Sequence, residues 1–311
     1  MGGRNSPFAW SGGVFALAVA VTASAQTPSY IFTTIDFPNA NSTAARGVND
    51  AGQIVGYFSD STGTHAFLLS DGIFTSIDYP RASSTQGRGI NSAGEIVGYF
   101  TDSIGTHGIF RDTGGNFSPA IDAPGATKFG TFALGINDVS SQIVGDFFVA
   151  TGQQQGFLDS GGSFTRIDVP GVMHSTAATG INNRSQIVGY SDMKDGFLDT
   201  GGSFTTIDVP DSNYTFPFGI NGAGQIVGFF GAILCEPKKA THGFLYSGGS
   251  FKTIDVPRAT QTCAYGINST GHIVGLFFGH HGNAWLPCDA RRWYRTLGPM
   301  VEVSDGVRQR D

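Results

Sequence analysis

The hydrophobic and polar positions of the chain follow one pattern that recurs six times. Its clearest copy, GINSAGEIVGYF, runs from Gly89 to Phe100. The six copies begin at Gly47, Gly89, Gly135, Gly180, Gly219 and Gly266, so successive starts are separated by 42, 46, 45, 39 and 47 residues. Self-similarity at this period indicates a repeat architecture, in which each unit buries its apolar faces against its neighbours.

Each unit contains four short apolar runs, which in the first unit are residues 45–49, 53–58, 65–70 and 73–79. The links at residues 49–52 and 70–72 are tight, glycine-bearing turns, which predict hairpins and therefore four antiparallel strands per unit. In the second run, Ile54 and Phe58 point to one face and Val55 and Tyr57 to the other. Because both faces are apolar, neighbouring sheets must cover both. Blades packed around an axis meet this demand better than a solenoid or a single sandwich.

The ends of the chain predict how the ring of blades closes. The fourth run ends in Ile-Asp-x-Pro, at Ile35, Ile77, Ile121, Ile167, Ile207 and Ile254. The first of these precedes the first repeat, and the last repeat stops after its third run at residues 284–286. We therefore expect an all-β, six-bladed β-propeller of four-stranded antiparallel blades, closed by residues 31–37 pairing with residues 284–286 in the last blade. Such closure leaves no open sheet edge.

The termini do not follow the repeat. Residues 1–25 are typical of a signal peptide, with Arg4, an apolar run and Ala23-Ser24-Ala25 as cleavage site; an uncleaved anchor is the alternative. Residues 30–287 form the predicted propeller and residues 288–311 a C-terminal tail to which we assign no structure. No segment after the signal peptide is predicted to span a membrane.

Composition narrows the class of partner. The chain has 46 glycines and only 14% charged residues, as turn-dense β structure requires. Its net charge of -6 disfavours nucleic acid as a partner.

The alternation of the GIN-x-x-G-x-IVG-Y/F run, a His-Gly-Phe-type run and the Ile-Asp-x-Pro run, from Thr33 to Leu286, resembles the HAF family of extracellular repeat proteins. This resemblance implies export from a bacterial cell, to the medium or the cell surface.

Several polar residues recur in every unit and are interpreted as structural. The asparagines are expected to cap their own turns; they are Asn49, Asn91, Asn137, Asn182, Asn221 and Asn268. Asp78, Asp122, Asp168, Asp208 and Asp255 share one strand position before the strand-ending proline or the residue preceding it. His65, His107 and His242 share the start of the third strand, where other units carry Gln155, Asp195 and Asn283, so that position needs only a hydrogen-bonding side chain. We predict no metal site and no cofactor, and the loop at residues 60–64 is expected to be a turn.

A ligand site is predicted where the repeats differ. Reversal of each strand puts the short turns on one rim and the long connections, with His174 and Tyr214, on the other, and binding residues concentrate on such loops. The residues that precede the six repeat glycines are Arg46, Arg88, Leu134, Thr179, Phe218 and Tyr265. If the first strand is innermost, Arg46, Arg88, Phe218 and Tyr265 approach the axis and suit an anionic or sugar-like ligand. In an oxidising compartment we expect a disulfide between Cys235 and Cys263, each placed in a long-rim connection, with Cys288 unpaired.

The preferred function is a secreted β-propeller that serves as a binding or interaction module for a carbohydrate or protein ligand. No catalytic motif is present, so no catalytic residue is assigned. An extracellular propeller enzyme acting on glycans or lactones is the alternative, and it needs carboxylates or metal ligands that are unique to single blades and converge near the axis. A structural surface protein without a small ligand is the third hypothesis.

Overall fold

The computed structural model describes residues 30–172, 175–231, 240–279 and 300–305, and all regular elements in these ranges are β-strands. In the first repeat, β2 (Ser42–Val48), β3 (Ile54–Ser59), β4 (Thr64–Ser70) and β5 (Ile73–Ile77) pair in chain order as an antiparallel sheet. These bounds lie close to the predicted runs, so the expected hairpins are confirmed. The Gly72 backbone has a φ of 77° in the β4–β5 turn, a conformation that favours glycine.

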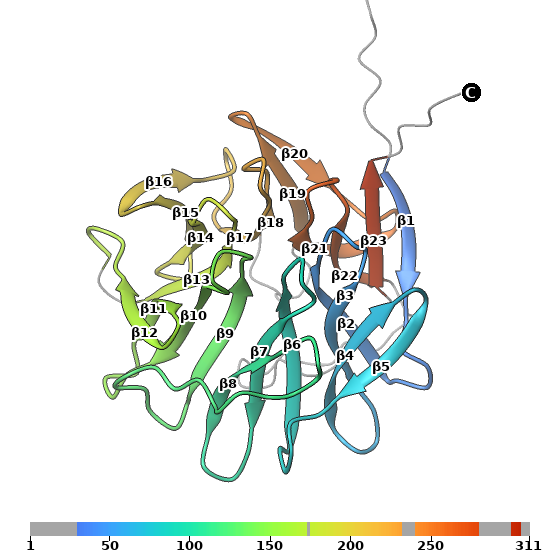
Figure 1. Cartoon of the computed structure of the whole chain (residues 1–311). Coiled ribbons are helices and arrows are strands. Elements are labelled where there is room, and N and C mark those ends of the chain that lie inside the picture. The colour runs from blue at the N-terminus through green and yellow to red at the C-terminus, as the bar shows by residue number, and fades with distance from the viewer. Residues whose placement is uncertain (1–29, 173–174, 232–239, 280–299, 306–311) are drawn as a thin grey trace, which may run out of the picture.

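The later repeats fold in the same way. Four-stranded antiparallel groups are formed by β9 (Thr131–Ile136), β10 (Ile143–Phe148), β11 (Gln154–Ser160) and β12 (Ser163–Ile167); by β13 (Thr176–Ile181), β14 (Gln186–Ser191), β15 (Asp195–Thr200) and β16 (Ser203–Ile207); and by β17 (Thr215–Ile220), β18 (Ile226–Gly231), β19 (Thr241–Ser247) and β20 (Ser250–Ile254). Single parallel contacts, β4 with β6 and β19 with β21, join neighbouring groups at one residue pair each. The protein is therefore a β-propeller, and Figure 1 shows its first strands gathered around the centre.

The second repeat has an irregular outer segment. Here β6 (Ser84–Ile90), β7 (Ile96–Thr101) and β8 (Thr106–Arg111) pair as before, but only two isolated bridges, Gly108 with Ile121 and Arg111 with Phe117, follow on the outside. Pro119 lies between these bridges and has no N–H to donate. The fourth strand is thus interrupted at the proline.

The last group combines both ends of the described chain. β21 (Ala259–Ile267) pairs with β22 (Ile273–Gly279), which pairs with β23 (Met300–Asp305), and β23 pairs with β1 (Tyr30–Ile35). Figure 1 shows β1 and β23 side by side. The third strand therefore comes from the segment that the sequence analysis placed outside the repeats as a tail, and residues 284–286, expected in that role, lie outside the described residues. The signal peptide lies outside them as well.

The strand-ending segments are tied to the following repeat by threonine. The backbone N–H of Phe37, just after β1, donates to Thr43 Oγ1 in β2 at 2.9 Å, and Tyr79 N–H donates to Thr85 Oγ1 at 3.0 Å. The Phe37 ring also stacks on Phe58 at 3.6 Å between centroids. The segment after β1 thus contacts β2 as the segment after β5 contacts β6.

The repeat glycines allow the innermost strands to come into close contact. A Cβ added to Gly47 would lie 2.9 Å from Arg88 O, and one added to Gly266 would lie 2.8 Å from Arg46 O and 3.1 Å from Gly47 Cα. Real Cβ atoms are essentially never found closer than 3.0 Å to a neighbour. Glycine is therefore required at Gly47 and Gly266 by packing against the neighbouring repeat.

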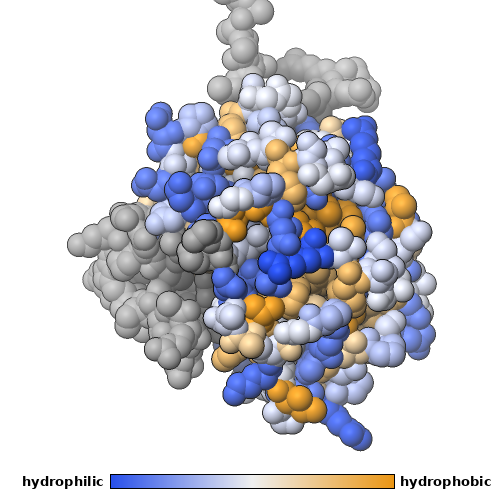
Figure 2. Space-filling view, turned by 90° about the vertical axis from the view of Figure 1, so that its left-hand side faces the viewer, coloured by the Kyte–Doolittle hydropathy of each residue, from blue (hydrophilic) through white to orange (hydrophobic). Residues whose placement is uncertain are grey.

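Apolar side chains fill the space between neighbouring sheets, as the two apolar faces of each strand predict. Val55, Ala66 and Ile77 of the first group pack with Ile90 and Ile96 of the next. Full burial of a large apolar side chain contributes about 1.5–3 kcal/mol to the free energy of unfolding. The outer strands, such as β12 and β16, carry exposed residues. Figure 2, which views the molecule from the left-hand side of Figure 1, shows hydrophilic residues interspersed with apolar areas on the surface.

Candidate functional site

A β-bulge directs the residue before each repeat glycine toward the centre. In the first group the pairing of β2 with β3 shifts between Ala45 and Gly47, which leaves Arg46 without a partner residue. The same shift occurs around Arg88 in β6. It also occurs around Leu134, Thr179, Phe218 and Tyr265. Bulges commonly redirect a side chain next to functional sites, and here they bring six side chains of five different types to equivalent positions.

Arg46 lies against two aromatic rings. Its guanidinium carbon is 3.8 Å from the centroid of the Tyr265 ring and 5.3 Å from that of Tyr57, and its Nη2 donates to the Tyr57 hydroxyl at 2.9 Å. Phe218 meets Tyr265 edge to face at 4.8 Å. Stacking and hydrogen bonding restrict the guanidinium to one orientation. The structure thus brings together Arg46, Phe218 and Tyr265, as the sequence predicted.

Arg88 lies near the same tyrosine ring, Tyr57, and is held by the second repeat. Its guanidinium carbon is 5.6 Å from the Tyr57 ring centroid, and its Nη2 donates to the Tyr99 hydroxyl and, at 3.0 Å, to Gln86 Oε1. The Tyr99 hydroxyl also donates to Gln86 Oε1 at 2.7 Å. The Nε atoms of both Arg46 and Arg88 are buried without a hydrogen-bond partner. Buried donors are normally paired, so two donors remain for a further group.

A carboxylate that the sequence analysis did not select completes the site. Asp146, on β10, is 4% exposed and occupies the position that carries tyrosine in the first, second and fourth repeats. Gln154 Nε2 donates to Asp146 Oδ2 at 2.7 Å, and Gln154 also hydrogen-bonds the Tyr190 side chain. We call the set Arg46, Tyr57, Gln86, Arg88, Tyr99, Asp146, Gln154 and Tyr190 the inner polar cluster.

Burial and the arginines change the acidity of groups in this cluster. Burial raises the pKa of Asp146 to about 7, although Gln154 and Arg88 both act to lower it. Burial and the Asp146 charge raise the pKa of the Tyr190 phenol. Burial would also raise the pKa of Tyr57, but Arg46 and Arg88 together lower it. The cluster is therefore one electrostatic unit with two fixed positive charges and one carboxyl group that titrates near neutral pH.

The fifth and sixth repeats give the centre an apolar side. Phe216, Phe229, Tyr265 and Leu276 belong to one buried cluster, and Phe218 packs against it. At the same inner positions the first three repeats carry arginine, glutamine and aspartate. The centre of the propeller is thus polar on one side and aromatic on the other.

The other residues predicted for the ligand site or the disulfide lie either in the core or outside the described residues. His174 lies outside the described residues. Tyr214 stacks on Phe216 at 6.3 Å and packs against the core, where it supports β17. Cys263 was expected in a connecting loop, but it lies within β21 and is 1% exposed. Cys235 and Cys288 lie outside the described residues. The disulfide between Cys235 and Cys263 therefore stays a prediction, but the loop position of Cys263 on which it was based is wrong.

The side chains of the repeated histidines and aspartates form hydrogen bonds that link the third strand of a repeat to the end of its fourth strand. His65 Nδ1 lies 2.6 Å from Asp78 Oδ1, and His242 Nδ1 lies 2.9 Å from both Asp255 oxygens. The Asp60 loop is a turn, as predicted, because Asp60 Oδ1 accepts hydrogen bonds from the Thr62 and Gly63 N–H groups. Across the described residues, no group of three His, Cys, Asp or Glu side chains could hold a metal ion.

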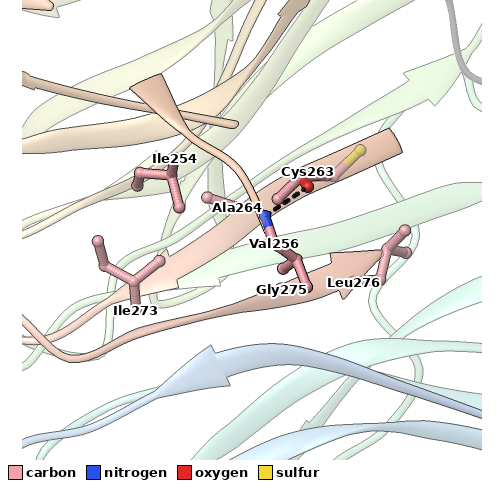
Figure 3. Close-up of a pocket in the computed structure, with 8 residues that line it drawn as sticks. Ile254, Val256, Cys263, Ala264, Ile273, Gly275 and Leu276 are labelled. Carbon is pink, nitrogen blue, oxygen red and sulfur yellow. Dashed lines mark hydrogen bonds between the residues drawn. The ribbon is translucent and has the colours of Figure 1, made fainter. Parts of the chain in front are cut away.

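Two cavities outside the inner polar cluster are alternative candidates for a ligand site. The first, near Val256 and Ala264, has a volume of about 10 Å³ and an almost wholly apolar lining (Figure 3), so it has room for about one water molecule and little to bind it. The second has a volume of about 450 Å³ and lies between the second and third repeats, lined by Ser141 and Asp159 among others. Two of its polar groups already have partners, since Asp159 Oδ1 accepts the Gly162 N–H in a turn and Ser141 Oγ donates to Glu95 of the second repeat.

The sequence contained a signal for the missed residues. Gln86 stands where other repeats have Ala44, Phe132, Ala177, Phe216 or Cys263, and Gln154 stands where they have Thr64, Thr106, Lys194 or Thr241. Position-by-position comparison of the first three strands of each repeat, and not only of the residue before the glycine, would have identified Gln86, Asp146 and Gln154 as departures. Only the structure shows which of these residues lie close together in the folded protein.

No family model matches the chain, and no curated protein matches it. Among solved structures, a putative gluconolactonase has a TM-score of 0.52 at 10% identity, covering 90% of this chain and 93% of that one. A streptogramin B lyase has a TM-score of 0.48 at 12% identity, covering 88% and 97%. A mutant Aleuria aurantia lectin in complex with Fucα1-6GlcNAc has a TM-score of 0.47 at 13% identity, covering 79% and 90%. At these identities the similarity concerns the fold alone.

Proposed function

We propose that the protein is a secreted binding module, a six-bladed β-propeller that holds a small anionic ligand at the inner polar cluster. The observation that carries the proposal is the pair of buried, unpartnered Nε atoms of Arg46 and Arg88, whose guanidinium groups both lie near the Tyr57 ring. Guanidinium groups bind carboxylate and phosphate through short, charge-assisted hydrogen bonds. A ligand anion would give both donors a partner.

The six-bladed, closed form is part of the proposal. It is supported by the pairing of β1 with β23 and by the hydrogen bond from Asn268 Nδ2 to Asn49 O between the last and first repeats. Closure matters for function because it holds Arg46 against Tyr265, which belong to the first and the last repeat. Half of the anion site therefore depends on it.

Secretion rests on residues 1–25 and on the resemblance of the repeats to the HAF family of extracellular proteins. The structure adds that residues 30–172, 175–231, 240–279 and 300–305 include no helix long and apolar enough to cross a membrane. Mass spectrometry of the mature protein from the culture medium tests this part, with a new N-terminus just after Ala25 as the expected result.

Thermal melting in the presence of simple anions tests the binding site. At constant ionic strength, which keeps screening equal, acetate, sulfate and phosphate are compared with chloride. We expect at least one of the three to raise the melting temperature of the wild type, and Arg46→Gln and Arg88→Gln to remove most of that increase. Arg166→Gln is the matched control, because Arg166 is 55% exposed in its side chain on the outer strand β12. No increase with any anion, or an equal loss in the control, contradicts the proposal.

A further inference from the structure

The departures from the repeat pattern concentrate in the first three repeats and are linked to one another. Gln86 orients Arg88 and Tyr99, and Gln154 orients Asp146. A carboxylate in place of a repeat tyrosine does not improve packing, because burying an ionisable group costs free energy unless it is compensated. Its presence at a position that is 4% exposed is more easily explained by ligand recognition than by folding.

Asp146 and the arginines have opposite charge but do not neutralise each other by contact. Among the described side chains no ion pair joins Asp146 to either arginine, although Arg88 is near enough to lower the pKa of Asp146. Within the described residues, the carboxylate accepts a side-chain hydrogen bond from Gln154, at Oδ2. The cluster thus presents donors on Arg46 and Arg88 and an acceptor on Asp146, with Arg88 as the arginine that acts on the carboxylate.

From this arrangement we infer that the ligand is a hydroxycarboxylate, such as a sugar acid, whose carboxylate binds Arg46 and Arg88 and whose hydroxyl group donates to Asp146. This inference rests on the proposed function, because it takes the two arginines as the anion site. A ligand with only a carboxylate would leave Asp146 facing an added negative charge. A neutral polyol would leave both arginine Nε atoms unpaired.

The aromatic side of the centre agrees with this ligand class. Phe218 and Tyr265 lie next to Arg46, opposite the polar residues of the second and third repeats. Sugar acids combine polar groups with an apolar C–H face, and binding sites for small molecules typically combine apolar walls with few, fixed polar groups. The tyrosine and phenylalanine rings supply such a wall.

Calorimetry with four probes tests the inference. Acetate carries the charge alone, D-glucose the hydroxyls alone, and glycolate and D-glucuronate carry both. For the wild type we expect glycolate or D-glucuronate to bind at least about ten-fold more tightly than acetate, the effect of one additional hydrogen bond to a charged group, and D-glucose to bind less tightly than acetate.

Two variants separate the cluster from the competing cavity. Asp146→Asn keeps the size of the side chain and should reduce the preference for the hydroxycarboxylate over acetate to within about two-fold. Asp159→Asn, a buried carboxylate in the cavity of about 450 Å³, should leave that preference unchanged. Loss of the preference in Asp159→Asn instead would move the site to the cavity.

A measurement on the wild type covers the case in which Asp146→Asn does not fold. The ratio of glycolate to acetate affinity should fall as pH is lowered from 8 to 6, because Asp146 becomes protonated while both ligands stay ionised. Arg88 and Tyr190 are the charged and titratable neighbours of Asp146, and burial raises the pKa of the Tyr190 phenol further above this pH range. If no carboxylate binds, the proposed function itself fails. If acetate and the hydroxycarboxylates bind equally at all pH values, anion binding stands and this inference is overturned.

Discussion

Asn268 donates its side-chain amide to the backbone carbonyl of Asn49 at 3.0 Å, across 219 positions of sequence. It is one of six equivalent bonds, in which each repeat asparagine donates to the asparagine of the next repeat. The same side chain caps its own turn, as predicted, because Asn268 Oδ1 accepts the His272 N–H. Each asparagine therefore joins a local turn to a neighbouring repeat.

Replacing one of these asparagines should weaken the whole fold. Asn268→Ala removes the turn cap and leaves the buried Asn49 carbonyl without this donor, so we expect the free energy of unfolding to fall by roughly 1–3 kcal/mol. Urea denaturation measures it. Asn116→Ala is the control, because Asn116 is exposed and bonds only within its own turn. Equal stability of Asn268→Ala and wild type would show that the bond between repeats contributes nothing.

The repeat glycines make a second prediction. Gly266→Ala places a methyl group against Arg46 O and Gly47 Cα, and such overpacking should cost roughly 1–3 kcal/mol. Gly222→Ala is the matched control, since a Cβ there meets no atom within 4 Å and the residue is not in the positive-φ region. Thermal melting of both variants gives the comparison, and a neutral Gly266→Ala would contradict the close contact of the inner strands.

Stability should depend on pH through Asp146. Its pKa is about 7 in the folded protein against an ordinary 3.8, so the folded state holds an extra proton between these values. The stabilisation is present below about pH 4 and is lost as pH rises to about 7, by roughly 4 kcal/mol at most. Asp146→Asn should match the wild type at about pH 4 and below and exceed its stability at pH 8, as measured by urea denaturation. A constant difference between the two proteins from pH 5 to pH 8 would argue against a raised pKa.

Removal of β1 should expose the outer edge of the last group. A chain that begins at Asn39 lacks the strand that pairs with β23 and the Phe37 ring that stacks on Phe58. We expect a lower melting temperature, a broader transition or aggregation, because an unpaired strand edge associates with other chains. A chain that begins at Gln26 keeps β1 and is the control. If both chains melt alike, closure by β1 is wrong.

The sequence by itself determined the repeated unit. Alternation of apolar residues with glycine-bearing turns predicted the strand bounds, the hairpins and the two covered faces, because these depend on neighbours within about ten residues. The asparagine caps and the turn at Asp60 likewise depend only on residues that are close together in the sequence. The sequence also placed Arg46, Arg88, Phe218 and Tyr265 at one equivalent position of the repeat, but their approach to the axis depended on the assumption that the first strand is innermost.

Only the tertiary structure decided the contacts between repeats. The strand after β22 is formed by residues 300–305, which match no copy of the pattern and so gave no signal. The glycine and asparagine contacts join residues about 40 or more positions apart, and no local rule prefers one partner over another. Asp146 became a candidate only when folding placed it near Arg88 and Tyr190, because burial and neighbouring charges, not spacing in the chain, set its chemistry.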